Sequence, residues 1–306
     1  MAKTLLTNRG LARDLLEKGG EYYELCKPRV VALMVFTALV GMLLAAPGGV
    51  GLDVLMFGLG GIALMAAAAA AINHLADRHI DAVMARTRGR PLPAGTLSVR
   101  EVLVFAAVIG TLGFVILMTR VNTLTAVLTL LSLVGYALVY TLFLKRRTPQ
   151  NIVIGGAAGA MPPLLGWTAV TGHPDAHGLL LFLIVFTWTP PHFWALALYR
   201  KQEYAKAGIP MLPVTHGEAL TRLHILLYTV LLVVITVLPY LTRMSGPLYL
   251  LGAMGLGSGF LYQAWKLYRV PSKERALRTF FYSIVYLMAL FAVLLVDRYL
   301  PLMLMR

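Results

Sequence analysis

Three polar side chains stand four residues apart directly after a long apolar run. Asn73, Asp77 and Asp81 follow the apolar residues 54–72, and positions i, i+4 and i+8 of an α-helix project from nearly one face. A carboxylate near hydrocarbon is costly and is kept mainly where it faces a cavity or a partner. Carboxylate and amide oxygens suit Mg²⁺ that carries substrate phosphates. The spacing therefore predicts a catalytic Mg²⁺ site formed by these three side chains.

Arginines follow this acidic stripe. Guanidinium groups fork onto phosphate oxygens, so we predict that Arg86 and Arg90 bind a diphosphate whose other oxygens bind the metal. One alternative is that these arginines only anchor the loop to anionic lipid headgroups. Another is that Asp77 and Asp81 only form salt bridges, for example to Arg78.

A second polar connection spans residues 200–222 and begins with Arg200, Lys201 and Glu203. We predict that Glu203 completes the metal site, and that Arg200 and Lys201 bind the diphosphate and offset the charge that grows on it as it leaves. Lys201 and Glu203 are therefore candidate catalytic residues. The alternative is that basic residues stand here because they are expected at any cytoplasmic helix end.

The elements that position these residues are membrane helices. The chain is 59% hydrophobic and only 13% charged, with a mean hydropathy of +0.77, far from the balance of soluble proteins. Unbroken apolar runs of about 20 residues indicate helices, whereas a barrel would show short alternating strands. We predict an all-α polytopic membrane protein with spans near 30–46, 54–72, 102–119, 123–144, 152–170, 179–199, 223–241, 247–268 and 280–296. Glycines and prolines interrupt the fifth run and the first is short, so the count is eight or nine.

The net charge of +14 follows the predicted topology and not a nucleic-acid footprint. All but four of the 27 Lys and Arg precede the first span or lie in or beside the connections after spans two, four, six and eight. The positive-inside rule then places the N-terminus in the cytoplasm and, with nine spans, the C-terminus outside. Residues 1–26 are predicted to lie along the membrane surface, and residues 27–300 to form the membrane domain. Cys26 is the single cysteine, which excludes an internal disulfide.

The spacing of the polar connections suggests an internal repeat. Connections 73–101 and 200–222 are separated by four spans, which predicts two four-helix repeats plus one further helix around a central cavity open to the cytoplasm. A transporter would also carry acids and broken helices in the membrane. Here, however, the acids cluster at one predicted end beside arginines that suit phosphate, which favours an enzyme.

At these residues the chain resembles the UbiA-type intramembrane prenyltransferases, whose hallmark is Asn-x3-Asp-x3-Asp after the second helix. Within that family, Arg86-Thr-x-x-Arg90-Pro, Pro191-His192 and the run from Tyr204 to Val214 resemble the branch that farnesylates haem B. Many members carry a second Asp-x3-Asp motif. Here Glu203 stands without a partner at Ala207, which puts a second full metal site in doubt.

The resemblance implies a Mg²⁺-dependent enzyme of the bacterial inner membrane. Its substrates would be farnesyl diphosphate and haem B, joined at a haem vinyl group with addition of water, and its partners a haem A synthase or a terminal oxidase. A quinone precursor or another aromatic acceptor is the alternative within the family.

Aromatic and basic residues supply the remaining candidates. The π faces of aromatic rings stabilise a cation, and the predicted wall around the prenyl cation consists of Tyr136, Tyr140, Trp188, Phe193, Tyr199 and Tyr204. The predicted haem-binding residues are His192, Arg78, His79 and Trp194. His192 is the strongest of these because Pro190 and Pro191 are expected to break the sixth span just before it.

Overall fold

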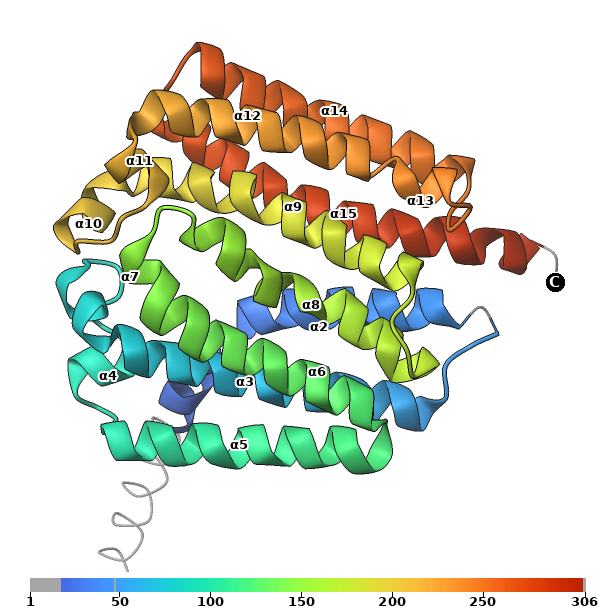
Figure 1. The fold of residues 1–306 in the computed structure, drawn as a ribbon, viewed down its shortest axis with the longest axis horizontal. Helices are drawn as coiled ribbons and strands as arrows, with labels where there is room; N and C mark the ends of the chain where they lie inside the picture. Colours follow the sequence, from blue (N-terminus) through green and yellow to red (C-terminus); the bar gives the residue numbers. More distant parts are fainter. Residues whose placement is uncertain (1–17, 47, 305–306) are drawn as a thin grey trace, which may run out of the picture.

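A computed structural model describes residues 18–46 and 48–304, with side chains described as far as residue 300. All regular secondary structure in these ranges is helical, and the long helices lie side by side in one bundle (Figure 1). The predicted surface segment 1–26 lies largely outside the described residues. Its described part is helical over 18–25 and packs onto the bundle through Leu25 and through the ring of Tyr22, which contacts Phe105.

Helices occupy each of the nine places predicted for a membrane span. They are α2 (Pro28–Ala45), α3 (Leu52–Val83), α5 (Val99–Arg120), the continuous run of α6 (Thr123–Val134), η1 (Gly135–Leu144) and α7 (Lys145–Arg147), α8 (Asn151–Thr171), α9 (Ala176–Tyr199), α12 (Gly217–Ile235) with α13 (Leu238–Leu241), α14 (Pro247–Arg269) and α15 (Lys273–Leu304). Within the described ranges, eight of these runs are long and apolar enough to cross a membrane, and α14 is not among them. Several glycines and Gln263 lower the hydropathy of α14, so its crossing stays a prediction.

The prolines do not break the fifth and sixth spans, and this prediction was wrong. Pro162 and Pro163 lie inside the continuous α8, and Pro190 and Pro191 lie inside the continuous α9. Proline removes a backbone donor, and neighbouring helices and Ser or Thr hydroxyls let membrane helices tolerate this loss.

The helices pack in two similar series. In the first half α2 contacts α3, α3 contacts α5, and α5 contacts α6, while in the second half α8 contacts α9, α9 contacts α12, and α12 contacts α14. The last helix, α15, packs against α14, α9 and α2. This order of contacts is the one that two four-helix repeats followed by one further helix would give.

Two glycines let the halves approach closely where α2 crosses α8. A Cβ on Gly41 would lie 2.1 Å from the Pro163 carbonyl oxygen, and a Cβ on Gly166 would lie 1.9 Å from the Ala38 carbonyl oxygen. Small residues permit such backbone contact between membrane helices. The two halves of the bundle therefore meet here with backbone close to backbone.

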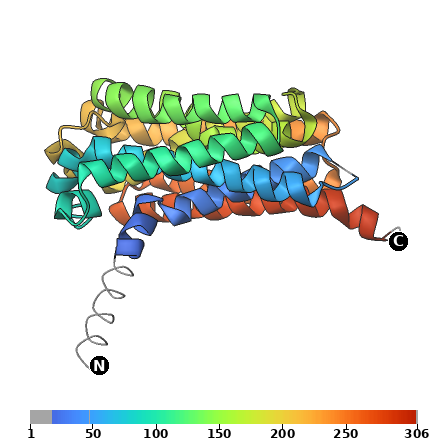
Figure 2. The ribbon, with the colours of Figure 1, turned by 90° about the horizontal axis from the view of Figure 1, so that it is seen from below.

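Both polar connections lie at the same end of the bundle. The short helices α4 (Pro91–Ala94), α10 (Lys201–Lys206) and α11 (Leu212–Thr215) gather there together with α7, whereas α15 ends at the opposite end (Figures 1 and 2). Connections 73–101 and 200–222 therefore meet at this end. The side of the membrane to which this end belongs stays a prediction.

Candidate active site

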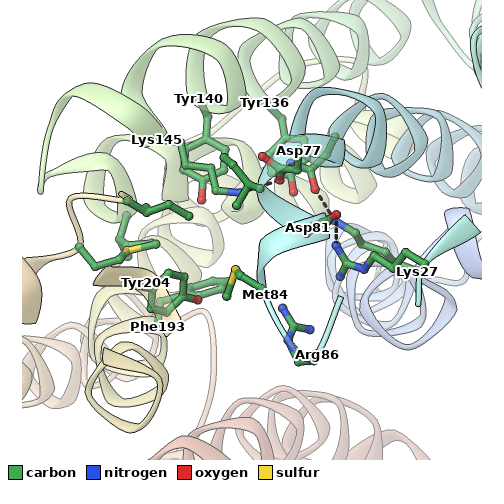
Figure 3. Close-up of a pocket in the computed structure, with 16 residues that line it drawn as sticks. Lys27, Asp77, Asp81, Met84, Arg86, Tyr136, Tyr140, Lys145, Phe193 and Tyr204 are labelled. Atoms are coloured by element: carbon green, nitrogen blue, oxygen red, sulfur yellow. Dashed lines mark hydrogen bonds and ion pairs between the residues drawn. The ribbon is translucent and has the colours of Figure 1, made fainter. Parts of the chain in front are cut away.

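A cavity of about 150 Å³ lies at the end of the bundle where the two connections meet (Figure 3). Nine predicted site residues line it: Asn73, Asp77, Asp81, Arg86, Arg90, Tyr136, Tyr140, Phe193 and Tyr204. Seven further residues, which the sequence analysis did not single out, complete the lining: Lys27, Ile80, Met84, Lys145, Ile152, Ile209 and Met211. The charged side chains of this lining all come from the first half of the chain, whereas the apolar and aromatic side chains come from both halves.

The acidic stripe forms as predicted because α3 continues as one 32-residue helix through Val83. Asn73, Asp77 and Asp81 are 3 to 4% exposed. The Asn73 amide nitrogen donates to Asp77 Oδ2 at 3.0 Å. Asp77 Oδ1 is buried and has no hydrogen-bond partner among the described residues. An unpaired buried carboxylate oxygen is costly, so this atom is the best indication that the cavity is built for a ligand.

A cation contacts each member of the stripe. Lys145 Nζ lies 2.6 Å from Asp77 Oδ2, and Arg90 Nη1 lies 2.7 Å from Asp81 Oδ2. Lys27 Nζ donates to Asn73 Oδ1. Figure 3 shows the Lys27 and Lys145 side chains extending toward the acidic residues of the stripe. The sequence analysis predicted only Arg90, because Lys27 and Lys145 come from other elements and resemble ordinary topological charges at helix ends.

Lys27 is held in an uncommon backbone conformation. It has φ 48° and ψ 59°, in the left-handed region, immediately before Pro28 begins α2. For a residue other than glycine this conformation costs roughly 1–2 kcal/mol. Burial, helped by the positive charges of Arg90 and Lys145, lowers the pKa of the Lys27 ammonium to about 7. Strained backbone conformations and perturbed pKa values are both more frequent at functional sites than elsewhere in a protein.

A π-helix presents the two tyrosines. The η1 segment Gly135–Leu144 is wound as a π-helix, a rare form that is frequent at functional sites. The Tyr136 and Tyr140 rings stack with centroids 5.5 Å apart. Gly155 of α8 faces Tyr140, where an added Cβ would lie 2.1 Å from a ring carbon. The missing side chain of Gly155 therefore leaves the space that the Tyr140 ring fills beside the cavity.

Arg86 lies at the mouth of the cavity and, unlike Arg90, has no carboxylate partner among the described residues. Partial burial of its side chain is the main cause that lowers the pKa of the Arg86 guanidinium, and the positive charges of Arg90 and Arg200 lower this pKa further. The loop that carries it is fastened by the Thr87 hydroxyl, which donates to the Asp81 carbonyl oxygen at 3.0 Å. Arg86 is thus positioned to meet an anion that enters the cavity.

Several predicted residues of the second connection do not line the cavity. Lys201 Nζ pairs with Glu218 Oε1 at 2.9 Å, and Arg200 Nη1 pairs with Glu203 Oε1 at 3.1 Å. The Arg200 guanidinium also lies over the Tyr199 ring, at 5.8 Å from its centroid. Tyr204 is the residue of this connection, among those predicted, that reaches the cavity.

The predicted haem-binding residues do not line this cavity either. Arg78 donates to the Leu75 carbonyl oxygen at 3.0 Å, and His79 is exposed. Trp194 is buried edge-on against His224 and Tyr228, with centroids 5.7 and 5.2 Å away.

His192 lies in an aromatic sandwich between α9 and α15. Its ring stacks on Trp188 with centroids 4.2 Å apart and on Phe280 with centroids 4.6 Å apart. The Trp188 indole nitrogen donates to the Ser283 carbonyl oxygen at 2.7 Å, and His192 Nδ1 lies 2.7 Å from Ser283 Oγ. Phe193, which lines the cavity, meets the His192 ring edge-on with centroids 4.9 Å apart. His192 is therefore adjacent to the cavity, on the far side of Phe193.

The donor set of the stripe fits Mg²⁺ bound together with a substrate. Within the described residues no group of three or more His, Cys, Asp or Glu side chains forms a metal site by itself. Two carboxylates and one amide, each binding through one oxygen, leave half of an octahedral coordination shell open, and Mg²⁺ is commonly bound by one or two carboxylates plus phosphate oxygens. Asp77 Oδ1, which has no hydrogen-bond partner among the described residues, is one oxygen free to take part.

An all-helical membrane bundle with two carboxylates and an amide at one end defines the class of intramembrane prenyltransferases. Among solved structures, the chain aligns with a digeranylgeranylglyceryl phosphate synthase at a TM-score of 0.78 and 20% identity, over 92% of this chain and 99% of that one. It also aligns with a UbiA homologue from Archaeoglobus fulgidus bound to GPP and Mg²⁺, at a TM-score of 0.58 and 18% identity, over 90% of this chain and 99% of that one. These likenesses establish the fold.

Residues 34–291 match the UbiA prenyltransferase family, and the chain belongs to this family. It is 63% identical over 280 residues to the "Protoheme IX farnesyltransferase" of Teredinibacter turnerae, covering 92% of this chain and 90% of that protein. It is 60% identical over 304 residues to the protein of the same name from Azotobacter vinelandii, covering 99% of both. The protein is a multi-pass membrane prenyltransferase, and the predicted family is confirmed.

Proposed function

We propose that this enzyme transfers the farnesyl group of farnesyl diphosphate to a vinyl group of haem B, with addition of water, to give haem O and diphosphate. The observation that carries the proposal is the cavity in which Asp77, with one unpartnered oxygen, is surrounded by cations suited to a diphosphate. The names of relatives at 60 to 63% identity support farnesyl and haem as the two substrates.

The charged end of the cavity would bind the diphosphate. Asn73, Asp77 and Asp81 would hold Mg²⁺, which when bound offsets negative charge on the phosphate oxygens. Arg86, Arg90, Lys27 and Lys145 would bind those oxygens directly, and their charges would stabilise the leaving diphosphate more strongly than the intact ester. Lys145 and Lys27 would thus have the role that was predicted for Lys201 and Arg200.

The apolar and aromatic wall would protect the allylic cation. As the bond between C1 and the diphosphate oxygen breaks, Tyr136 and Tyr140 would present their stacked rings to the positive charge. Phe193, Met84 and Ile152 line the same cavity and would exclude water until the new bond forms. C1 then bonds to the terminal vinyl carbon of haem, and water captures the resulting cation at the inner vinyl carbon with loss of a proton.

His192 would orient the haem. The Ser283 hydroxyl donates to the Phe280 carbonyl oxygen at 2.6 Å, so at the His192 contact Ser283 Oγ accepts and His192 Nδ1 carries the proton. This assignment leaves a lone pair on Nε2, the atom suited to ligate haem iron. Arg78, His79 and Trp194 stay candidates for contact with the porphyrin or its propionates, and Lys201 and Glu203 for a role at the entrance.

The setting in the cell follows from the same proposal. The cationic end of the bundle would face the cytoplasm, with the membrane domain at residues 27–300 in the inner membrane and the C-terminus outside. The product would pass to a haem A synthase or be inserted into a terminal oxidase, and these are the proposed partners.

The test is product mass. Purified protein in detergent, given farnesyl diphosphate, haem B and Mg²⁺, should yield the mass of haem O, and the Asp77→Ala variant or chelation of the metal should abolish it. A quinone precursor offered in the same assay is the competing acceptor. Farnesylation of that acceptor with haem left unchanged would refute the haem assignment and keep the prenyltransferase.

A further inference from the structure

Three of the four cations that line the cavity are paired with the side chains that would bind the metal. Lys145 contacts Asp77 at 2.6 Å and Arg90 contacts Asp81 at 2.7 Å, while Lys27 donates to Asn73 Oδ1. The three cations come from three different segments: Lys27 precedes α2, Arg90 precedes α4 and Lys145 begins α7. One oxygen of each aspartate and the single side-chain oxygen of Asn73 are thus occupied by a positive charge from another segment.

These pairs stabilise the protein before any substrate is bound. The carboxylates of Asp77 and Asp81 are almost fully buried, with side-chain exposures of 4 and 6% in the two ion pairs. Removing the partner of a buried charge is strongly destabilising because the remaining charge is uncompensated. The cations therefore perform in the resting protein the neutralising role that a metal would otherwise have.

The charge balance of the lining favours anions. Four cationic side chains, Lys27, Arg86, Arg90 and Lys145, face the two carboxylates, a formal net charge of +2 when Lys27 is protonated. A free divalent cation that enters this cavity meets like charges at short range in a medium of low dielectric constant. A diphosphate that enters meets net attraction and Arg86, which has no carboxylate partner among the described residues.

We propose that the cavity binds the diphosphate first, and that Lys145, Arg90 and Lys27 then exchange their carboxylate and amide partners for phosphate oxygens, which opens the metal site. This exchange rests on the proposed function and specifies the order in which its ligands bind. Only side-chain rotations of two lysines and one arginine are required, and the bundle stays unchanged. Since coupling between two ligands is reciprocal, bound metal tightens the diphosphate by the same factor by which diphosphate tightens the metal.

Two titrations of detergent-purified protein test the exchange without any turnover. The first adds inorganic pyrophosphate in the presence of EDTA, and the second adds Mn²⁺ alone, each followed by calorimetry. The native protein should bind pyrophosphate without metal and should bind Mn²⁺ alone weakly. Lys145→Gln should shift the two affinities in opposite directions: about tenfold or more weaker for pyrophosphate and about tenfold or more tighter for Mn²⁺, where tenfold corresponds to about 1.4 kcal/mol.

Lys18→Gln is the matched control, because Lys18 pairs with Glu101 at 3.2 Å in an exposed position away from the cavity. It should alter neither affinity. If Lys145→Gln does not fold, as judged by its thermal unfolding, Arg90→Gln should show the same opposite shifts through Asp81.

Two results would overturn the exchange: native protein that binds Mn²⁺ alone as tightly as Lys145→Gln does, or a variant in which both affinities fall together. A native protein that does not bind pyrophosphate at all would instead refute the proposed function at its site.

Discussion

Gly155 controls the position of an aromatic ring in the proposed cation wall. Replacing it with alanine would put a Cβ 2.1 Å from one Tyr140 ring carbon, whereas real Cβ contacts essentially never fall under 3.0 Å. The ring must therefore move by at least the difference, 0.9 Å. Its stack on Tyr136, with centroids 5.5 Å apart, would be disturbed by the same movement.

The expected effect falls on catalysis. Loss of one cation–π contact costs about 0.5–2 kcal/mol, or roughly 2- to 30-fold in kcat/KM, and a misplacement of about 1 Å can cost on the order of 100-fold. Gly155→Ala should therefore lower kcat/KM for prenyl transfer by about 2- to 100-fold. Binding of pyrophosphate should be unchanged, because the substitution leaves the cations of the cavity in place.

Gly159→Ala is the matched control, since it lies on the same helix and its added Cβ would meet nothing within 4 Å. The assay is the initial rate of farnesyl transfer to haem B with Mg²⁺ at several concentrations of farnesyl diphosphate. If Gly155→Ala keeps the kcat/KM of the native protein, or if Gly155→Ala and Gly159→Ala lose kcat/KM equally, the role given to the Tyr140 ring is refuted.

Three further predictions concern stability and the metal. Gly166→Ala should lower the free energy of unfolding by about 1–3 kcal/mol, the usual cost of overpacking, because its Cβ would lie 1.9 Å from the Ala38 carbonyl oxygen. Thermal unfolding in detergent at one scan rate measures this loss. A melting temperature at or above the native value would contradict the prediction. Asp297→Ala removes the carboxylate that accepts hydrogen bonds from the Gly246 and Tyr249 backbone nitrogens at 2.5 and 3.0 Å. It should lower the free energy of unfolding by about 0.5–2 kcal/mol, as the loss of a helix cap does. Thermal unfolding under the same conditions checks this. Chelation of divalent metal should stop prenyl transfer. It should leave the unfolding temperature of the substrate-free protein unchanged, because cations already pair with the buried carboxylates. A large fall in the unfolding temperature would instead show that the protein holds a resident metal.

The sequence predicted the features that local spacing determines. Asn73, Asp77 and Asp81 share one face because α3 continues past its apolar part, and a four-residue period is sufficient to infer this. Arg86 and Arg90 follow closely on the same segment, so they also line the cavity. The helix positions were predictable because apolar runs of about 20 residues have few other structures available to them.

Features that depend on contacts between distant segments were not predictable in the same way. Lys27 and Lys145 lie 46 and 68 residues from their partners on α3, and in the sequence they look like the basic residues found at any helix end. The same argument explains Lys201, which appeared suited to a diphosphate but pairs with Glu218, 17 residues further along the chain. The π-helical winding of η1 has no simple sequence signal, although it decides where Tyr136 and Tyr140 project.

The most direct test of the proposed site is to locate the metal in a crystal or cryo-EM structure with bound substrate analogue. The protein with Mn²⁺ and the non-reactive farnesyl thiolodiphosphate should show the metal bound directly to carboxylate oxygens of Asp77 and Asp81. In a crystal the anomalous signal of Mn²⁺ identifies the metal. The Lys145 and Arg90 side chains should then contact the phosphates. A metal and diphosphate bound elsewhere, with the Lys145–Asp77 and Arg90–Asp81 pairs intact, would contradict the account.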